Sequence, residues 1–482
     1  MWIFFVCAGL FACSKKGSGP VTPVTPPDTT KPPVVVTYGS SVTLWLTNAD
    51  QSALLQKQNL ALRFSSATAI TPTIFVDTTQ LYQAIDGFGY ALTGGSATLI
   101  HQLPAAQQTA LLQELFLTDT NHIGVSYLRV TIGASDMSSR VFSYDDSASP
   151  AQPDTLLSHF DLADDKTDLV PVLQAIVALN PSIKILGSPW SAPLWMKSNN
   201  KSVGGSLLPQ YYDVYAQYFV RYIKAMKAAG ITIDAITPQN EPLNPLNNPS
   251  MSMVATEEEE FIKNHLGPAL QAAGLTTKII VYDHNPDVTA YALTILGDAA
   301  AAKYVDGSAW HLYAGTIDAL GNIHGAYPTK NVYFTEQYVA GPSNFAGDLA
   351  WHTRNLIIGA PRNWSRNVIE WNMAADANYG PHTAGGCSNC LGAFTINGSS
   401  ITRNTSYYII AHASKFVRPG SVRVFSTENP NHLQNVAFMT PDGKKVLIVL
   451  NDSNAAQTFA IAAGGMNFTT TLNGGAVGTY VW

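Results

Sequence analysis

Apolar and polar residues follow two alternating patterns along most of this chain. Short runs rich in β-branched and aromatic residues, typical of buried strands, recur between segments whose apolar residues return every three to four positions, typical of amphipathic helices. Helices are expected at 104–117, 169–179 and 211–229, and a further one opens at Thr256. The strand-like runs number eight, as a closed parallel barrel requires: 84–89, 125–132, 183–189, 233–237, 278–282, 307–313, 332–335 and 367–371.

The two ends of the chain have a different pattern. After a helical segment at 406–417, short strands separated by Pro-Asp-Gly and Gly-Gly turns follow at 421–425, 435–439, 445–450, 458–461, 468–472 and 479–482. Two more strand-like runs, 42–46 and 73–76, precede the barrel with no room for a helix-strand repeat. We therefore expect an α/β protein: a (β/α)8 TIM barrel over 81–417, with a β-sandwich built from both chain ends, 41–80 and 418–482.

The first forty residues are expected to comprise an export signal and a linker. Trp2 to Ala12 is an apolar run too short to span a bilayer and suited to a signal h-region. It ends in Leu10-Phe11-Ala12-Cys13, which resembles a bacterial lipobox, so residues 1–13 are expected to be a lipoprotein signal segment lipidated at Cys13. Residues 14–40, rich in Pro and Thr, cannot bury a core and predict an extended linker. We expect an exported protein attached to the bacterial outer membrane or cell surface only through this anchor; the alternative is an ordinary signal peptide and a secreted or periplasmic protein.

Composition excludes several classes of function. A net charge of −6 and a pI near 6.0 leave no basic surface for nucleic acid. No metal-ligand spacing or cofactor fingerprint occurs, so neither a metal nor a cofactor is expected, and we expect a monomer. Two of the four cysteines, Cys7 and Cys13, lie in the export segment. The others, Cys387 and Cys390, form a single CxxC without the second pair that a zinc site needs; in an exported protein a local disulfide is expected, with buried free thiols as the alternative.

Two glutamates each follow a strand-like run. Glu241 lies in Gln239-Asn240-Glu241-Pro242, and because proline cannot continue a strand ladder, its carboxyl should stand where the strand has stopped. Glu336 ends a similar run. The C-terminal ends of barrel strands form one rim, so the two carboxyls should meet. Glycoside hydrolysis with retention needs two carboxyls about 5 to 5.5 Å apart. This predicts Glu241 as acid/base and Glu336 as nucleophile; the alternative is that either is a solvated loop residue.

Other residues at the strand ends suit a sugar site. Arg129 lies inside a strand, where burial is costly unless the guanidinium faces a carboxylate; facing Glu336, it would keep that nucleophile ionised. A structural salt bridge is the alternative. Asn240 could hydrogen-bond a sugar 2-hydroxyl. Side chains that could bind hydroxyls or stack on sugar rings, or could simply belong to the core, are Asp136, Trp190, His311, Tyr313 and Trp371.

The acidic run 257–260 is expected to begin a helix. Thr256 with Glu259 three positions later has the spacing of a capping box, and acidic residues complement the positive end of the helix dipole. The run is therefore interpreted as a helix start rather than a metal site.

Seven motifs occur in order between residues 83 and 482, and on them the chain resembles glycoside hydrolase family 30, the family of lysosomal glucosylceramidase and of bacterial and fungal β-1,6-glucanases. The resemblance implies a retaining β-glycosidase with a (β/α)8 barrel and a β-sandwich, Glu241 as acid/base and Glu336 as nucleophile. By position it also implies substrate contacts from Arg129, Asp136, Trp190, Asn240, His311, Tyr313 and Trp371. The motifs are Ile85-Asp86-Gly87-Phe88-Gly89, Leu128-Arg129-Val130, Ser188-Pro189-Trp190-Ser191-Ala192-Pro193, Gln239-Asn240-Glu241-Pro242, Trp310-His311-Leu312-Tyr313, Phe334-Thr335-Glu336 and Glu370-Trp371-Asn372.

Departures from the family pattern bear on the substrate. Many members have Thr-Asp where this chain has Leu92-Thr93-Gly94-Gly95-Ser96, and the loop after Pro242 lacks the aromatics of the glucosylceramidase entrance. Together with Tyr282-Asp283-His284-Asn285 and the Gly385-Gly386-Cys387 loop, these features look closer to bacterial members that cut β-1,6-glucan. We expect an endo-β-1,6-glucanase acting on β-glucan. A glucosylceramidase-like or other exo-β-glucosidase is the first alternative, and a non-catalytic glycan-binding surface lipoprotein is the second.

Overall fold

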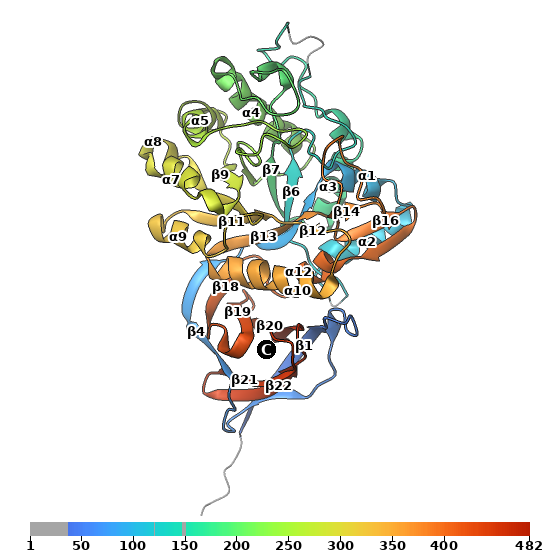
Figure 1. Ribbon diagram of the computed structural model, residues 1–482, viewed down its shortest axis with the longest axis vertical. Helices are drawn as coiled ribbons and strands as arrows, with labels where there is room; N and C mark the ends of the chain where they lie inside the picture. Colours follow the sequence, from blue (N-terminus) through green and yellow to red (C-terminus); the bar gives the residue numbers. More distant parts are fainter. Residues whose placement is uncertain (1–36, 120, 147–150) are drawn as a thin grey trace, which may run out of the picture.

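The computed structural model describes residues 37–119, 121–146 and 151–482. It consists of a barrel surrounded by helices and a β-sandwich packed beneath it, with the helix α12 (Thr405–Ser414) between them (Figure 1). The predicted signal segment, its Cys13 and residues 14–36 of the predicted linker lie outside the described residues.

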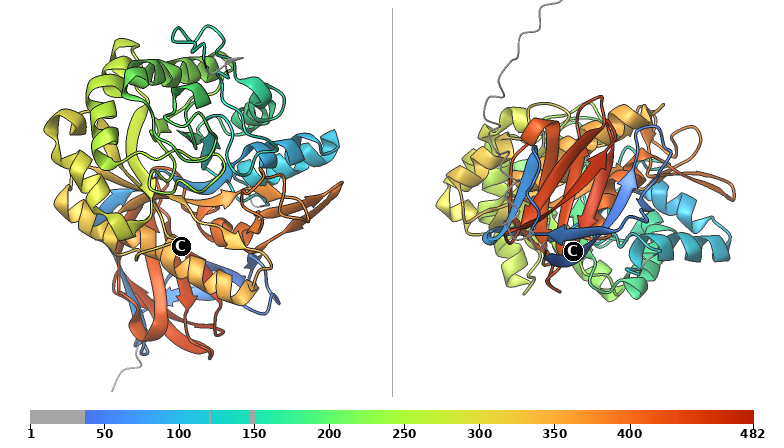
Figure 2. Two further views of the ribbon diagram at one scale, coloured as in Figure 1. Left: turned by 45° about the horizontal axis from the view of Figure 1, so that its top comes forward. Right: turned by 90° about the horizontal axis from the view of Figure 1, so that it is seen from below.

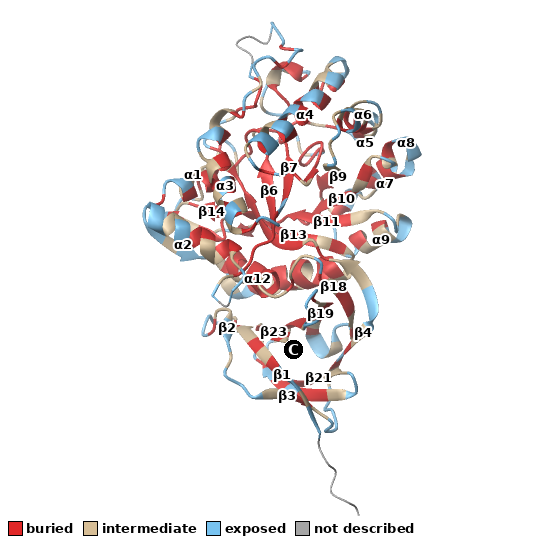
Figure 3. Cartoon of the chain, turned by 180° about the vertical axis from the view of Figure 1, so that it is seen from behind, coloured by how far each residue is buried: buried red, intermediate tan, exposed pale blue. Residues whose placement is uncertain are grey.

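The barrel is closed by eight parallel strands. Their order around the barrel is β10-β11-β13-β5-β6-β7-β8-β9, and β10 pairs with β9 to complete the ring. The predicted closed barrel of eight strands is confirmed, and its strands are almost wholly buried (Figure 3). The strands are β5 (Gly87–Leu92), β6 (Tyr127–Thr131), β7 (Lys184–Ser188), β8 (Ala235–Ile236), β9 (Lys278–His284), β10 (Val305–His311), β11 (Asn331–Glu336) and β13 (Ser365–Asn372).

Helices cover the outside of the barrel. In α4 (Tyr212–Ala228) the buried Tyr215, Phe219, Tyr222 and Met226 recur every three to four residues, so one face packs on the strands, as the pattern predicted. No helix among the described residues has the length and apolar character needed to cross a bilayer. The other α-helices are α1 (Gly94–His101), α2 (Ala105–Phe116), α3 (Leu169–Leu179), α5 (Ala255–Phe261), α6 (Gly267–Ala272), α7 (Ala290–Gly297), α8 (Ala299–Ala302), α9 (Ala319–Ala326), α10 (Phe345–His352) and α11 (Ala360–Arg362), with π-helical turns at Ile262–Leu266 and Thr353–Gly359.

The capping box predicted at Thr256 and Glu259 is wrong, because the N-cap of α5 is Val254, two residues earlier. The helix begins at Ala255, and the Glu257 carboxylate accepts a hydrogen bond of 2.9 Å from the backbone N–H of Val254. Because Val254 has no side-chain acceptor, the cap is one-sided, and Glu259 instead pairs with Lys263 on the helix surface. The acidic run does lie at the start of a helix, as expected, although Glu258 turns inward and is fully buried.

The sandwich is assembled from both chain ends, as predicted (Figure 2). Its strands form one sheet in the order β2-β1-β23-β20-β19-β18-β4-β21-β22-β3, and a further pairing of β1 with β3 joins the two ends. The strands are β1 (Tyr38–Thr47), β2 (Gln56–Lys57), β3 (Leu62–Ser65), β4 (Thr73–Ala84), β18 (Val422–Ser426), β19 (Leu433–Met439), β20 (Lys445–Asn451), β21 (Gln457–Ala463), β22 (Met466–Leu472) and β23 (Val477–Val481). Five shorter strands lie in the loops after β11 and β13: β12 (Val339–Ala340), β14 (Ala374–Ala375), β15 (Cys390–Leu391), β16 (Phe394–Asn397) and β17 (Ser400–Arg403).

A buried histidine joins the barrel to the sandwich. His412, on α12, lies 2.8 Å from the hydroxyl of Thr479 through Nδ1 and 2.8 Å from the hydroxyl of Thr47 through Nε2. These threonines come from the last and the first strand of the sandwich, so one side chain ties both chain ends to the barrel. Burial lowers the pKa of His412 to about 3, which keeps the imidazole neutral.

We expect this histidine to make the protein sensitive to acid. Its folded pKa of about 3 lies below the ordinary value of 6.5, so the unfolded state binds the extra proton and stability falls as pH drops below 6.5. Between pH 6.5 and pH 4 His412 should cost about 3 kcal/mol of unfolding free energy. Urea unfolding of wild type and of His412→Gln measures the difference, because the glutamine amide can hydrogen-bond but cannot titrate. An unfolding free energy that changes equally with pH in the two proteins would contradict the prediction.

Candidate active site

The interior of the barrel is layered. One apolar layer takes a residue from each of seven strands: Tyr127, Leu186, Ala235, Ile280, Ala309, Tyr333 and Ile369. Side chains alternate along a strand, so positions two residues further on point to the same interior, one step nearer the C-terminal rim. Six of these positions are Arg129, Ser188, Thr237, His311, Thr335 and Trp371, all buried. A polar layer therefore lies directly above the apolar one.

Arg129 is the cation of this layer. It is fully buried, and its guanidinium donates to Glu336 Oε2 at 2.6 Å, to Asn240 Oδ1 at 2.7 Å and to Asp283 Oδ2 at 2.7 Å. The guanidinium carbon lies 4.8 Å from the ring centre of Trp190. The structure thus places Arg129 against Glu336, as predicted, and against a second carboxylate that the sequence analysis did not assign to the site.

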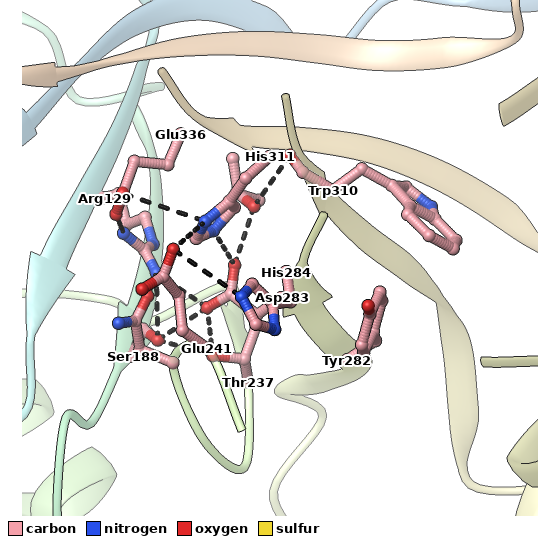
Figure 4. Close-up of polar contacts among 12 residues, drawn as sticks. Arg129, Ser188, Thr237, Glu241, Tyr282, Asp283, His284, Trp310, His311 and Glu336 are labelled. Carbon is pink, nitrogen blue, oxygen red and sulfur yellow. Dashed lines mark hydrogen bonds and ion pairs between the residues drawn. The ribbon is translucent and has the colours of Figure 1, made fainter. Parts of the chain in front are cut away.

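That second carboxylate is Asp283, at the centre of the hydrogen-bond network (Figure 4). Besides Arg129 and His311, it accepts hydrogen bonds from three hydroxyls, those of Ser188 at 2.7 Å, Thr237 at 2.8 Å and Thr335 at 2.6 Å. Burial raises the pKa of Asp283, but Arg129, His311 and the hydroxyls outweigh burial and hold it well below its usual range. A carboxylate that directly follows an apolar strand run was the available signal, the same one that marked Glu241 and Glu336.

His311 lies between the two predicted catalytic glutamates. Its Nδ1 is 3.2 Å from Glu241 Oε1 and 3.7 Å from Glu336 Oε1, and its Nε2 is 3.2 Å from Asp283 Oδ1. Carboxylate oxygens of Glu241 and Glu336 come within 4.8 Å of each other. This spacing suits a retaining glycosidase, whose carboxyls lie about 5 to 5.5 Å apart, and leaves no room for the water that an inverting enzyme places between them.

The charges of this cluster are coupled. Burial lowers the pKa of His311, but Glu336, Asp283 and Glu241 outweigh burial and raise it to about 9. Burial raises the pKa of Glu241, but hydrogen bonding and the charge of His311, together with His284 and Asn244, lower it to about 2. Burial is the largest influence on Glu336 and raises its pKa, against the opposing effects of His311 and Arg129. The free site therefore keeps its mobile proton on His311.

Backbone strain is concentrated at the same positions. Glu241, Tyr282 and Asp283 have φ angles of 45°, 79° and 54°. These angles lie in the left-handed region, which residues other than glycine and asparagine rarely adopt. The backbone N–H of Glu241 donates to the carbonyl of Asp283 at 3.0 Å, so the two strained segments hold each other. The strain turns both carboxylates inward at the ends of adjacent strands.

The other predicted site residues surround this cluster. The Tyr313 hydroxyl donates to Glu336 Oε1 at 2.9 Å, and because Asn240 Oδ1 is held by Arg129, the Asn240 amide NH2 points elsewhere and can donate to a ligand. The rings of Trp190 and Trp371 lie 5.2 Å apart, and the indole N–H of Trp190 has no partner among the described residues. The disulfide between Cys387 and Cys390 lies beside these rings.

Asp136 is also buried, with one carboxylate oxygen unpartnered among the described residues. Burial, Glu336 and Glu241 raise its pKa to about 7. A buried carboxyl without a full set of partners is costly, so Asp136 and the Trp190 indole have the unsatisfied polar atoms that sugar hydroxyls would satisfy.

Within residues 37–119, 121–146 and 151–482, two groups of side chains have the composition of metal ligands. Glu241, His311 and Glu336 offer ligand atoms within 4.8 Å of one another, but Arg129 lies 2.6 Å from Glu336 and already supplies the positive charge that a cation would bring. Asp145, Asp154 and His159 form a similar group in the loop after β6. There Asp154 already accepts hydrogen bonds from Ser158 and from the backbone of His159.

This barrel carries two buried carboxylates from different strands, whose oxygens face each other across less than 5 Å. These features define the class of retaining glycoside hydrolases. The chain is a member of glycosyl hydrolase family 30. The model of the family's TIM-barrel domain matches residues 85–417, and that of its beta sandwich domain matches residues 420–480. The sandwich strands before residue 85 complete the second domain from the other end of the chain.

Relatives of two kinds are similar to this chain. It is 38% identical over 395 residues to endo-1,6-beta-D-glucanase neg1 of Aspergillus fumigatus, covering 77% of this chain and 78% of the relative. It is 30% identical over 433 residues to the lysosomal acid glucosylceramidase of Mus musculus, covering 83% and 81%. A solved endo-beta1,6-glucanase structure superposes with a TM-score of 0.85 at 36% identity, covering 92% of this chain and 99% of that one.

We expect Asp283→Asn to lower kcat by about 100-fold or more, with KM changed much less, because the amide loses the charge that keeps His311 protonated and Arg129 in place. Steady-state kinetics on an aryl β-glucoside measure both constants. Glu258→Gln is the matched control: this buried carboxyl on α5 accepts from the backbone of Tyr282 but contacts neither glutamate. A folded Asp283→Asn protein with kcat within threefold of wild type would contradict the assigned role.

Proposed function

We propose that this family 30 hydrolase cuts β-1,6-glucan at internal bonds with retention of configuration. The observation that carries the mechanism is the pair Glu241 and Glu336, less than 5 Å apart and bridged by His311. Support for the linkage comes from the relatives: endo-1,6-glucanases are 36% to 38% identical over most of the chain, against 30% for the mouse glucosylceramidase. A barrel that only binds glycan would be expected to lack one of the two catalytic carboxylates, and here both are present.

In the first step, Glu336 attacks the anomeric carbon while the bond to the leaving oxygen breaks. Arg129 and Tyr313 each hold one oxygen of Glu336, so the carboxylate is oriented before the sugar arrives. The leaving oxygen, here the 6-oxygen of the next glucosyl unit, takes a proton from Glu241. The product of this step is a glucosyl ester on Glu336 and a shortened glucan.

The proton for this step is close to Glu241. The free site holds Glu241 ionised and His311 protonated, with Nδ1 3.2 Å from Glu241 Oε1. Arg129 and His311 provide two positive charges against the carboxylates Glu241, Glu336 and Asp283, so the cluster carries one excess negative charge. Transfer of the His311 proton to Glu241 gives Glu241 in its acid form and leaves the imidazole neutral. In the second step Glu241 takes a proton from water, which attacks the same carbon and frees Glu336.

We expect linear β-1,6-glucan to be cut to a ladder of gentio-oligosaccharides, because an internal cut releases products of many lengths. Early products should carry the β-anomer, since two displacements at one carbon restore its configuration. Chromatography separates the products by length, and proton NMR identifies the anomer that forms first. Glu336→Gln should lower kcat by at least 1,000-fold through loss of the nucleophile.

Other outcomes distinguish the alternatives. Glucose alone from the glucan, or turnover only of aryl β-glucoside and glucosylceramide, would replace the endo-glucanase with an exo-β-glucosidase of glucosylceramidase type. An α-anomer formed first would overturn the two-step mechanism. A Glu336→Gln protein as active as wild type would show that Glu336 is not the nucleophile.

We further propose that the protein is exported and anchored to the membrane through Cys13, on the support of the lipobox-like Leu10-Phe11-Ala12-Cys13 and the Pro-rich residues that follow. Cys13→Ser should then move the protein from the membrane to the soluble fraction and abolish its labelling by a fatty acid analogue. Unchanged fractionation and labelling in a bacterial host would contradict the anchor. A secreted, unlabelled wild-type protein would instead favour an ordinary signal peptide.

A further inference from the structure

The loop that carries the disulfide contacts four segments around the catalytic cluster. Its first contact is with the nucleophile segment. In the strand β15, Cys390 pairs with Ala340 of β12, which lies four residues after Glu336. The backbone N–H of Gly341 also donates to the carbonyl of Asn389 at 2.8 Å. The loop and the segment after the nucleophile therefore form one small antiparallel sheet.

The second contact is with Asp136. The backbone N–H of Thr383 donates to the carbonyl of Asp136 at 2.9 Å. Gly386 approaches the same carbonyl so closely that a Cβ there would lie 2.4 Å from its oxygen, and only glycine fits without a shift. The backbone amide of Cys387 acts on the Asp136 carboxyl and lowers its pKa, against the effect of burial. The loop thus holds the backbone of Asp136 through Thr383 and Gly386.

The third contact is with the aromatic pair. Cys390 is 2% exposed and packs in one cluster with Trp190, Trp371 and Met137. Its carbonyl accepts a hydrogen bond from the Asn372 side chain at 3.2 Å. Cys390 is therefore the buried end of the disulfide, fixed against the two indole rings, and Cys387 is the partly exposed end.

The fourth contact is with the segment that follows Glu241. The Asn248 side chain donates to the carbonyl of Ala384 at 2.9 Å, and the Thr383 hydroxyl donates to the carbonyl of Asn248. One loop thereby joins the segments after Glu241 and Glu336 to Asp136 and the aromatic pair. None of its hydrogen bonds among the described residues goes to Arg129, Asp283, His311 or either catalytic glutamate.

We propose that the Cys387–Cys390 disulfide is a positioning element of the sugar site, which sets affinity for the bound sugar ring by holding Gly386 against the backbone of Asp136 and Cys390 against Trp190 and Trp371. This rests on the proposed function only in that a β-glucosyl ring occupies the pocket; it does not depend on the linkage. Between the two cysteines lie only Ser388 and Asn389, both exposed. Without the covalent link, Cys387 and its amide lose their connection to the buried Cys390.

The consequence is a pocket that depends on redox state. One thiolate of a dithiol reagent attacks the disulfide, which releases one cysteine thiolate and forms a mixed disulfide with the other cysteine. The second thiolate of the reagent then attacks this mixed disulfide, which leaves two cysteine thiols on the chain and a cyclic disulfide in the reagent. The reduced loop keeps the hydrogen bonds of Thr383, but Gly386, which lies against the Asp136 carbonyl, is no longer tied to the buried Cys390 through its neighbour Cys387. Ground-state binding of the sugar therefore weakens, while Arg129, Glu241 and Glu336, which the loop's hydrogen bonds do not reach, keep their geometry.

The test compares wild type, wild type reduced with dithiothreitol, and Cys387→Ala/Cys390→Ala on an aryl β-glucoside. The reduced and double-variant proteins should show KM raised about tenfold, the loss expected for one hydrogen bond to a charged group, with kcat within about threefold of wild type. The double variant should not respond to dithiothreitol. Equal KM for all three proteins would overturn the proposal, and so would equal losses in kcat alone.

Two further measurements keep the outcome decisive. Gly386→Ala retains both cysteines but pushes the loop from Asp136, so it should raise KM in the same way even if the double variant fails to fold. Calorimetry measures the affinity for 1-deoxynojirimycin, a glucose-shaped amine, and so tests the sugar site without turnover. A wild type that binds this probe but does not cut β-1,6-glucan would count against the proposed function alone. Affinity for the probe unchanged by reduction and by Gly386→Ala would count against the disulfide alone.

Discussion

The buried charge of Arg129 constrains the rest of the barrel mouth. A guanidinium with no exposed surface is stable only if anions and hydrogen-bond acceptors surround it, and here Asp283, Glu336 and Asn240 do so from three different strand ends. Each of those groups would be costly to bury without Arg129. Arginine and its acceptors thus fix one another, and the nucleophile is oriented as a consequence of charge pairing.

The layered interior explains how this cluster is held. Apolar residues fill the barrel one layer below the polar groups. Because this layer is close-packed, the polar side chains cannot move deeper into the barrel. Strand alternation then places Arg129, Ser188, Thr237, His311 and Thr335 at one level. Asp283 and Glu241 reach the same level only because the backbone departs from regular strand geometry at both positions. The strained segments support each other through a backbone hydrogen bond, which keeps the carboxylate spacing short.

The sandwich contributes at a distance from the chemistry. Its strands contact the barrel through α12 and through arginines of the last barrel helices: Arg354 pairs with Asp452, and Arg362 donates to the carbonyl of Asn435. His412 joins strands from the two chain ends across the same boundary. In this contact α12 lies between the barrel and the sandwich (Figure 1).

The sequence by itself determined the architecture and the chemical identity of the site. The change between two hydrophobic periods predicted the eight barrel strands and the sandwich built from both ends, because burial on one or both faces leaves a regular pattern. Glu241 and Glu336 were found as charged residues at strand ends, and Arg129 as a charged residue inside a strand, in each case where the apolar pattern is broken. The capping box at Thr256 failed because the spacing of one acidic run fits several registers, and only the packing of Glu258 inward fixes which one forms.

Only the tertiary structure decided which of these groups touch. Asp283 accepts hydrogen bonds from residues 28 to 154 positions away, and no local pattern records such separations. The carboxylate distance that separates retention from inversion, the position of the proton on His311 and the contacts of the disulfide loop with Asp136 and the indole pair all depend on closure of the barrel. Sequence patterns report how each segment is buried, but closure alone brings charged groups from different strands within bonding distance and so sets their protonation.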